Sequence, residues 1–362
     1  MNYYENIVVF DKYRLVHLLA DNSFYSEFFG KNIETGEDVY VKMINPDKFT
    51  RYEVDKICFA SECAQIKNFD NPNILKLYAA GSYSNTMCIV SEYIPGFKLL
   101  NKYLNEVGLL SVKESLNIIQ KLALGLRYAH GRNVIHRSIR SSNIGIVENE
   151  HKEITTLKLF DFGVSQIIDF TNTTSDQVDE NFGFMAPETT GLLDHKVDAR
   201  SDLYSLGILL YRFLTGHYPF HADTIDSMVY QHVAVMPKDP VEYNPSVTPA
   251  VSKIVSRLLA KNPDQRYQTA NELINDIDVY FNSEDSSSAS DEETIIQTME
   301  RRSKILSRKT ELSQIRNMYT QALKSEGHFC LVQGPLGSGK SDLFSNLCLE
   351  FKESNIPFFR AR

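Results

Sequence analysis

The chain has 362 residues, which is more than one typical domain and fewer than three. Its formal net charge of −8 argues against nucleic acid as the main partner. No apolar run approaches the ~20 residues of a membrane span, and the N-terminus lacks the basic start and apolar core of a secretory signal. Five cysteines without a CxxC pair favour a reducing compartment, so we expect a cytoplasmic location and no membrane partner.

The first part of the chain predicts an antiparallel strand meander. Residues 13–45 alternate apolar and polar side chains in short runs, and Thr35 and Gly36 between two of these runs indicate a turn. A helix is predicted over 47–68. Two further strands, ILKLYAA and TMCIVSEY, follow with a turn near Gly81.

From Ser111 onwards the pattern favours helices. The segment SVKESLNIIQKLALGLRYAH opens with Ser111 and has Glu114 three residues later, which is a capping-box pattern. A loop over 131–150 and the strand LKLF come next. A second helix is predicted from near Ser201 to Gly216, and the segments TPAVSKIVSRLLAK and TANELINDIDVYF predict two more. The order indicates a small β-rich lobe followed by a larger helical lobe.

The composition changes after residue 281. Residues 282–293, NSEDSSSASDEE, are acidic and rich in serine, so a flexible linker is predicted over 282–303. A helix, the strand HFCLVQ, a glycine-rich turn and the helix SDLFSNLCLEF then indicate the start of an α/β domain over 304–362. A sheet of this kind needs several more parallel strands. We therefore expect the sequence to be the N-terminal part of a longer protein.

Four short motifs in the first 281 residues have a shared order and spacing. Lys42 lies in VYVKMI, and Glu62 follows on the predicted helix, before the segment NPN. Asn143 ends HRSIRSSN, and Asp161 opens DFG after the strand LKLF. On these residues the chain resembles the protein kinase family over 13–281. Further matches are Ala186-Pro187-Glu188, Asp202 and Arg266.

This resemblance implies an α+β, two-lobed protein-kinase fold with ATP and Mg²⁺ as cofactors. It implies that Lys42 holds the α- and β-phosphates with Glu62 as its partner, and that Asn143 and Asp161 bind the metal. Arg140, in place of the family's loop lysine, keeps a cation near the γ-phosphate. The alternatives are a surface ion pair for the first two residues and plain turn chemistry for the other two.

The departures from the family pattern concern phosphoryl transfer. Ser138 stands where the family has its catalytic aspartate, and a neutral serine cannot accept a proton at pH 7; general-base help is typically worth ~10² to 10⁴ in rate. The glycine-rich loop reads ADNSFY, without glycine, so the side chains of Asn22 and Tyr25 should hold the backbone off the phosphates. Glu180-Asn181 replaces a Gly-Thr pair whose threonine contacts the aspartate in many relatives.

A second phosphate-binding motif lies near the end of the chain. GPLGSGKS fits GxxxxGK[ST] between a predicted strand and a predicted helix, so backbone amides would cradle phosphates, Lys340 would reach the β- and γ-phosphates, and Ser341 would bind magnesium. A chance glycine-rich turn is the alternative. The upstream SRKTEL resembles the opening of AAA-like ATPase modules, which implies an incomplete P-loop NTPase domain over 304–362. The candidate residues are Gly334, Gly337, Gly339, Lys340 and Ser341.

A kinase-like domain joined to an AAA-like P-loop module resembles the N-terminal region of hybrid sensor histidine kinases of the fungal peroxide- and stress-sensor type. That resemblance implies a regulatory input region, with nucleotide and the signalling proteins of a phosphorelay as partners and further domains beyond residue 362. Three interpretations stay open. They are a nucleotide-binding, catalytically impaired regulatory module, which we favour, an active Ser/Thr kinase with an unorthodox loop, and a scaffold that binds no nucleotide.

Overall fold

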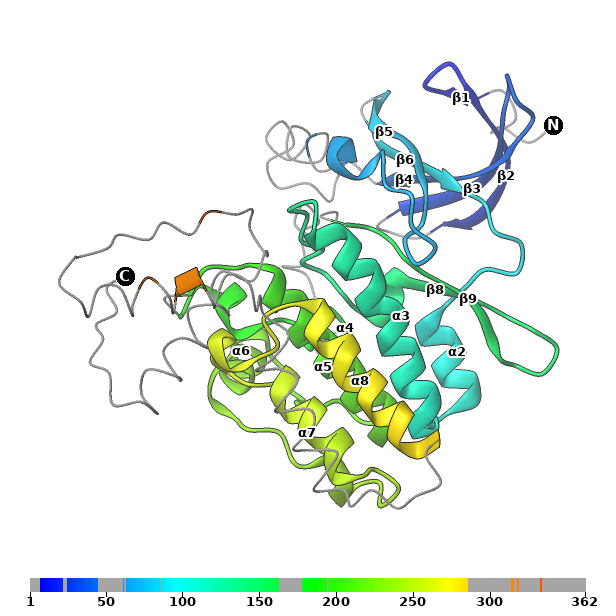
Figure 1. The fold of residues 1–362 in the computed structure, drawn as a ribbon. Helices are drawn as coiled ribbons and strands as arrows, with labels where there is room; N and C mark the ends of the chain where they lie inside the picture. Colours follow the sequence, from blue (N-terminus) through cyan, green and yellow to red (C-terminus); the bar gives the residue numbers. More distant parts are fainter. Residues whose placement is uncertain are drawn as a thin grey trace.

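The computed structural model describes most of the first 285 residues, arranged as a β-rich lobe and a helical lobe (Figure 1). The described residues are 7–21, 25–44, 61, 63–84, 86–162, 178–193 and 195–285, together with the isolated positions 314, 315, 318 and 333. The predictions for Glu62, for most of the helix over 47–68 and for the glycine-rich motif at 334–341 lie outside these residues.

One antiparallel sheet makes up most of the first lobe. In the described part of the chain it has six strands in the order β1-β2-β3-β4-β6-β5. The predicted turn at Thr35 and Gly36 is present, and Gly36 has a left-handed backbone with φ +75°. The strands are β1 (Val8–Val9), β2 (Tyr13–Asp21), β3 (Tyr25–Asn32), β4 (Asp38–Ile44), β5 (Leu77–Tyr83) and β6 (Thr86–Glu92).

Alternation along β4 determines which side chains face the helical lobe. Val39 and Val41 are fully buried in the apolar cluster of this lobe. Successive side chains of a strand point to opposite faces, so Tyr40 and Lys42 share the other face. That face lies towards the junction of the two lobes.

The described part of the second lobe contains seven helices, and the side chains of α5 are almost all buried. The capping box at Ser111 and Glu114 is present, and Gly216 ends α5 with φ 76°, as predicted. No helix in the described ranges is both long and apolar enough to cross a membrane. The helices are α2 (Leu100–Val107), α3 (Val112–His130), α4 (Val178–Phe182), α5 (Ala199–Thr215), α6 (Ile225–Ala234), α7 (Pro249–Leu258) and α8 (Ala270–Asp285).

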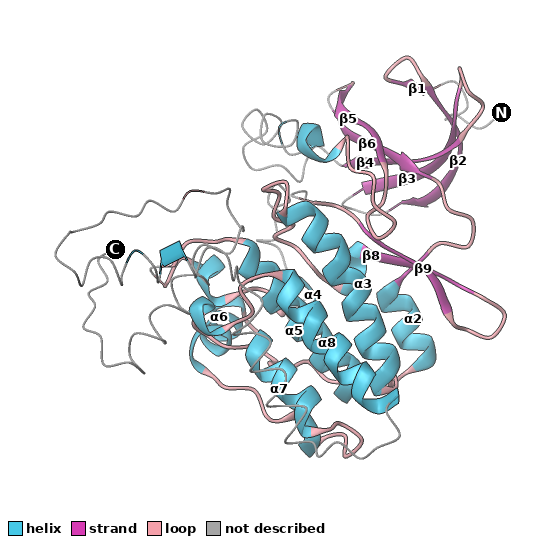
Figure 2. Cartoon of the chain, viewed as in Figure 1, coloured by secondary structure: helices cyan, strands magenta, loops and turns pink. Residues whose placement is uncertain are grey.

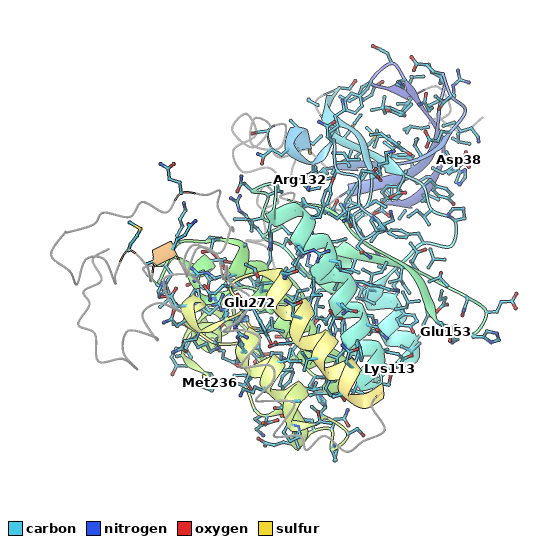
Figure 3. The ribbon with its side chains drawn as sticks, viewed as in Figure 1. Asp38, Lys113, Arg132, Glu153, Met236 and Glu272 are labelled. Atoms are coloured by element: carbon cyan, nitrogen blue, oxygen red, sulfur yellow. The ribbon has the colours of Figure 1, made fainter. Side chains whose placement is uncertain are left out.

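A small sheet lies where the lobes meet (Figure 2). It consists of β7 (Lys98–Leu99), β8 (Ile144–Glu148) and β9 (Ile154–Leu159), in that order. The β8–β9 hairpin projects from the helical lobe, with Glu153 near its end (Figure 3). A 3₁₀ turn (Ser141–Asn143) leads into β8, so the loop of residues 136–143 ends directly under the junction.

Three sequence predictions need correction. Gly81 lies inside β5, and the chain turns at Ser84 instead, with φ 43°. The predicted loop over 131–150 contains β8, whose four apolar or glycine residues are buried or half-buried by pairing with β7 and β9. Helix α8 continues to Asp285, four residues past the end of the predicted helix at 281.

Candidate active site

A cavity of about 380 Å³ lies between the two lobes. It brings together four residues that the sequence singled out, namely Lys42, Arg140, Asn143 and Asp161. Ser138 does not line this cavity. It lines a neighbouring cavity of about 540 Å³, and Arg140 contributes to the walls of both.

Lys42 is paired with Asp161 across the junction. The Lys42 ammonium donates to the Asp161 carboxylate, and the two side chains are only 8% and 11% exposed. Burial lowers the pKa of Lys42, but the neighbouring Asp161 charge more than offsets this and leaves that pKa above its ordinary value. The Tyr25 ring lies over the same ammonium, 4.4 Å from nitrogen to ring centre. Tyr25 therefore makes a cation–π contact with Lys42. That its side chain holds the backbone off the phosphates stays a prediction.

Asp161 has an unusual backbone conformation. Its φ is +61°, in the left-handed region that non-glycine residues rarely adopt. The next residue, Phe162, is buried, and its ring packs against His136 at 4.3 Å between centres. This packing and the pairing with Lys42 hold Asp161 in its left-handed conformation. Strained backbone conformations of this kind cluster at functional sites.

His136 has a structural role, as the sequence indicated. Its Nε2 lies 2.9 Å from the Phe160 carbonyl, to which it donates, and its Nδ1 accepts the backbone N–H of Ser138 at 3.3 Å. Burial lowers its pKa, so the ring is neutral at pH 7. Both nitrogens are engaged, and His136 therefore cannot serve as a replacement base.

Asp202, at the start of α5, holds the loop of residues 136–143 in place. Its carboxylate accepts the backbone N–H groups of His136 and Arg137, both at 2.8 Å, and lies 2.7 Å from Nε2 of His130. Burial alone would raise the pKa of Asp202, but His130 and the other hydrogen bonds lower it below its ordinary value. Arg137 is held in the left-handed region, with φ +64°. Asp202 therefore positions the loop.

Asn143 and Ser138 are joined by side-chain hydrogen bonds. The Nδ2 of Asn143 donates to the carbonyl oxygen of Ser138 at 2.9 Å and to its hydroxyl at 3.2 Å. Because the amide nitrogen is engaged in this way, the amide oxygen is the atom that Asn143 can offer to a metal. An amide oxygen and the Asp161 carboxylate are the hard oxygen donors that Mg²⁺ prefers. Both residues line the cavity between the lobes, so the residues present fit that ion.

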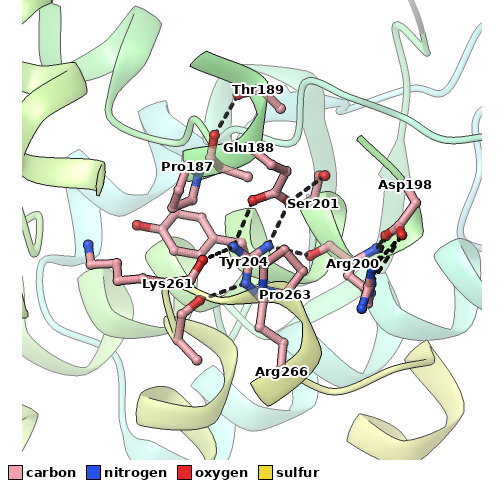
Figure 4. Close-up of polar contacts among 12 residues, drawn as sticks. Pro187, Glu188, Thr189, Asp198, Arg200, Ser201, Tyr204, Lys261, Pro263 and Arg266 are labelled. Carbon is pink, nitrogen blue, oxygen red and sulfur yellow. Dashed lines mark hydrogen bonds and ion pairs between the residues drawn. The ribbon is translucent and has the colours of Figure 1, made fainter. Parts of the chain in front are cut away.

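Glu188 and Arg266, which the sequence analysis named as further matches to the family, form a buried ion pair (Figure 4). Two parallel hydrogen bonds of 2.7 Å join them, and Ser201 donates to the same carboxylate at 2.6 Å. Arg266 also lies over the ring of Tyr204. The pair ties the segment that follows α4 to the helical core beneath the second cavity.

Asn181 contacts a residue that the sequence did not suggest. Its amide oxygen accepts a hydrogen bond from Nη1 of Arg140 at 3.3 Å. In many relatives a threonine in this segment contacts the catalytic aspartate. In this chain Asn181 joins the segment to Arg140 instead. The contact fixes Arg140 between the two cavities.

Two cavity residues escaped the sequence analysis. Tyr40 and Glu27 both line the cavity, and their side chains are hydrogen-bonded to each other. Burial, followed by the charge of Glu27, raises the pKa of Tyr40 well above its ordinary value. Tyr40 could have been identified from the sequence. It lies two residues from Lys42 on the same strand, and residues with this spacing share one face of the sheet.

The fold and the site define a protein kinase domain. The chain belongs to this family, since the family profile described as "Protein kinase domain" matches residues 23–277. The chain is 29% identical over 276 residues to the serine/threonine-protein kinase PrkC of Bacillus subtilis. This alignment covers 75% of this chain and 41% of that protein. The chain is 31% identical over 274 residues to PknB of Mycolicibacterium smegmatis, covering 74% of this chain and 42% of that protein.

Solved structures agree with the fold. The kinase domain of Mycobacterium tuberculosis PknI aligns with a TM-score of 0.60 at 20% identity, over 75% of this chain and 97% of that one. Rad53 residues 1–466, solved in complex with AMP-PNP, align with a TM-score of 0.57 at 20% identity, over 74% and 65% of the two chains. The chain spans about two fifths of the length of the two curated relatives.

Proposed function

We propose that this domain binds Mg-ATP between its lobes and transfers phosphate poorly or not at all. The cavity supports nucleotide binding because Lys42, Asn143 and Asp161 converge on it from three separate segments. Lys42 would hold phosphate oxygens, and Asp161 and Asn143 would hold the metal, whose charge offsets that of the phosphates. Rad53, whose fold is similar, was solved in complex with AMP-PNP, and this supports nucleotide binding by a domain of this fold.

The carboxylates among the described residues of the neighbouring cavity carry the second half of the proposal. Among the described residues that line the neighbouring cavity, Asp202 is the only carboxylate. Its oxygens are engaged by two backbone N–H groups and His130, and the side chain is buried. Ser138 has a hydroxyl where a base is needed, and general-base help is typically worth ~10² to 10⁴ in rate.

An active serine/threonine kinase is the second candidate, and the names of the curated relatives favour it. The two candidate functions predict different effects of the substitution Lys42→Ala. If the domain is active, robust phosphorylation of a generic protein substrate is lost in Lys42→Ala. If the domain is impaired, that phosphorylation is absent in both proteins while Mg-ATP binding depends on Lys42.

We further propose that the domain acts as the regulatory input of a phosphorelay histidine kinase. The support is the order of a kinase domain, an acidic serine-rich segment and the motif GPLGSGKS, which resembles the start of such proteins. Reading the coding sequence beyond residue 362 tests this proposal. A histidine kinase and a receiver domain are expected there, and an unrelated continuation would contradict it.

A further inference from the structure

Lys261 lies in the turn that follows α7, and its side chain reaches α6 in the helical lobe. The residue is half-buried. Its Nζ donates to the Gln231 carbonyl of α6 at 3.1 Å and lies over the Phe220 ring, 4.1 Å from the ring centre. A lysine ammonium has three N–H donors, and among the described residues this carbonyl is its one hydrogen-bond acceptor. The site thus gives a charged amine fewer partners than water would.

The charges around Lys261 do not provide a counter-ion. In the described part of the chain no carboxylate forms an ion pair with it, since Glu188 is paired with Arg266 and Asp264 with Arg200. The guanidinium of Arg266 donates to the backbone carbonyl of Lys261 at 3.1 Å. In Figure 4 the Lys261 side chain extends away from that guanidinium. The amine therefore has a cation nearby and no paired anion.

These surroundings favour the neutral form of the amine. Burial, followed by the charge of Arg266, lowers the pKa of Lys261 to about 7. The nearby titratable side chains are neutral, because burial and then the Lys261 charge lower the pKa of His232 to about 3, and burial raises that of Tyr204. About half of the Lys261 amines are thus unprotonated at pH 7, against fewer than about 1 in 10³ for an ordinary lysine in water. An unprotonated, half-buried lysine amine is a nucleophile.

We propose that Lys261 is a site of acylation by small acyl phosphates, of which acetyl phosphate is the simplest. The amine nitrogen attacks the acyl carbon and forms a C–N bond. The bond from that carbon to the phosphate oxygen breaks, and the leaving phosphate takes the proton that the amine loses. The product is a neutral amide, which keeps one N–H for the Gln231 carbonyl and removes the half-buried charge.

The aromatic neighbour favours an acyl group over a carbamate. Carbon dioxide also reacts with neutral lysine amines, but the product of that reaction is an anion. The face of the Phe220 ring carries partial negative charge, so it repels an anion and accepts the methyl group of an acetyl amide. The proposal is independent of nucleotide binding, because Lys261 is not among the residues that line the two cavities of the candidate active site.

Acetyl phosphate incubated with the full chain, followed by peptide mass spectrometry, measures the acetylation rate at each lysine. At pH 7 we expect Lys261 to react about tenfold faster than the exposed Lys113 and Lys238, because its fraction of free amine is higher. Its rate should rise from pH 6 and level off by about pH 8, whereas the amine of a lysine model peptide gains rate up to about pH 10. Lys261→Arg should lose this adduct and leave acetylation at the two exposed lysines unchanged.

Denaturation separates the effect of the fold from that of the local sequence. In guanidinium chloride the rates at Lys261 and Lys238 should become similar, because the buried surroundings of Lys261 are lost. A preference for Lys261 that persists in the denatured chain would overturn the inference, since the neighbouring residues in the sequence would then be its cause. Slower acetylation of Lys261 than of Lys238 at pH 7 in the folded chain would overturn it as well.

Discussion

The amide group of Asn143 holds Ser138 by donating to both its carbonyl and its hydroxyl oxygen. Ser138, the position that would need a proton acceptor, is therefore hydrogen-bonded to Asn143, which is a candidate metal ligand. Restoring a carboxylate at 138 would place it next to the same amide, which is a favourable donor for a charged acceptor. We therefore expect the loop to accept an acid at this position.

Ser138→Asp is accordingly expected to raise phosphoryl transfer. A general base contributes ~10² to 10⁴ in rate, and we expect the gain to fall below that range because the loop at residues 20–25 still lacks glycine. Transfer from γ-labelled ATP to a generic protein substrate measures it. Ser138→Asn is the matched control, since it has a similar shape and no proton acceptor. A Ser138→Asp protein less active than wild type would contradict the account.

Removing the charge of Lys42 should destabilise the fold as well as abolish nucleotide binding. Loss of one partner from a buried ion pair leaves the other charge unpaired and typically costs about 3–5 kcal/mol. Denaturant unfolding of Lys42→Met should show a loss of this order. The double variant Lys42→Met/Asp161→Asn should recover part of it, because no buried charge is then left unpaired. Additive losses in the double variant would show that the two side chains are not coupled.

We expect Tyr25 to compete with phosphate for the Lys42 ammonium, because its ring lies over that group. A cation–π contact contributes about 0.5–2 kcal/mol, which corresponds to about 2- to 30-fold in affinity. Tyr25→Gly should therefore tighten Mg-ATP binding by a factor in this range, and calorimetry measures the change. Tyr25→Phe keeps the ring and should bind as wild type. Weaker binding by the glycine variant would show that the tyrosine contacts the nucleotide.

The buried pair of Glu188 and Arg266 predicts a pH dependence of stability. Burial raises the pKa of Glu188, but the bonds from Arg266 more than offset this and leave the pKa below its ordinary value of 4.5. A carboxyl with a lowered pKa in the folded state stabilises fully above its unfolded pKa and loses this contribution as pH falls through the folded pKa. The free energy of unfolding should fall less steeply below pH 4.5 in Glu188→Gln than in wild type. Equal slopes would contradict the assignment.

The sequence predicted the parts of the site that lie in short local motifs. Lys42, Asn143 and Asp161 each stand in a recognisable segment, and the structure places all three on one cavity. Phe97 also lines that cavity and approaches Gly145 closely, which was not predictable in this way because it depends on how two segments meet in the folded chain. The sequence also missed β8, which is short and takes its strand form from pairing with its neighbours.

Helices α2 and α6 were missed for a related reason. Both are short, at 8 and 10 residues, and a helix of this length draws its stability mainly from the surface on which it packs. The long helices α3 and α5 were predicted, because Ser111 and Gly216 mark their ends with specific chemistry. Local chemistry thus located the long elements, and tertiary packing determined the short ones.

Calorimetric titration of the protein with Mg-ATP tests the central claim most directly. Saturable binding is expected, weakened by omission of Mg²⁺ and lost in Lys42→Ala, because Lys42 is a buried cation of the cavity that would hold the phosphates alongside a metal held by Asp161 and Asn143. The titrated sample, analysed for phosphorylated protein and ADP, should show little turnover. An absence of binding at millimolar ATP, or rapid turnover that depends on Lys42, would contradict the account.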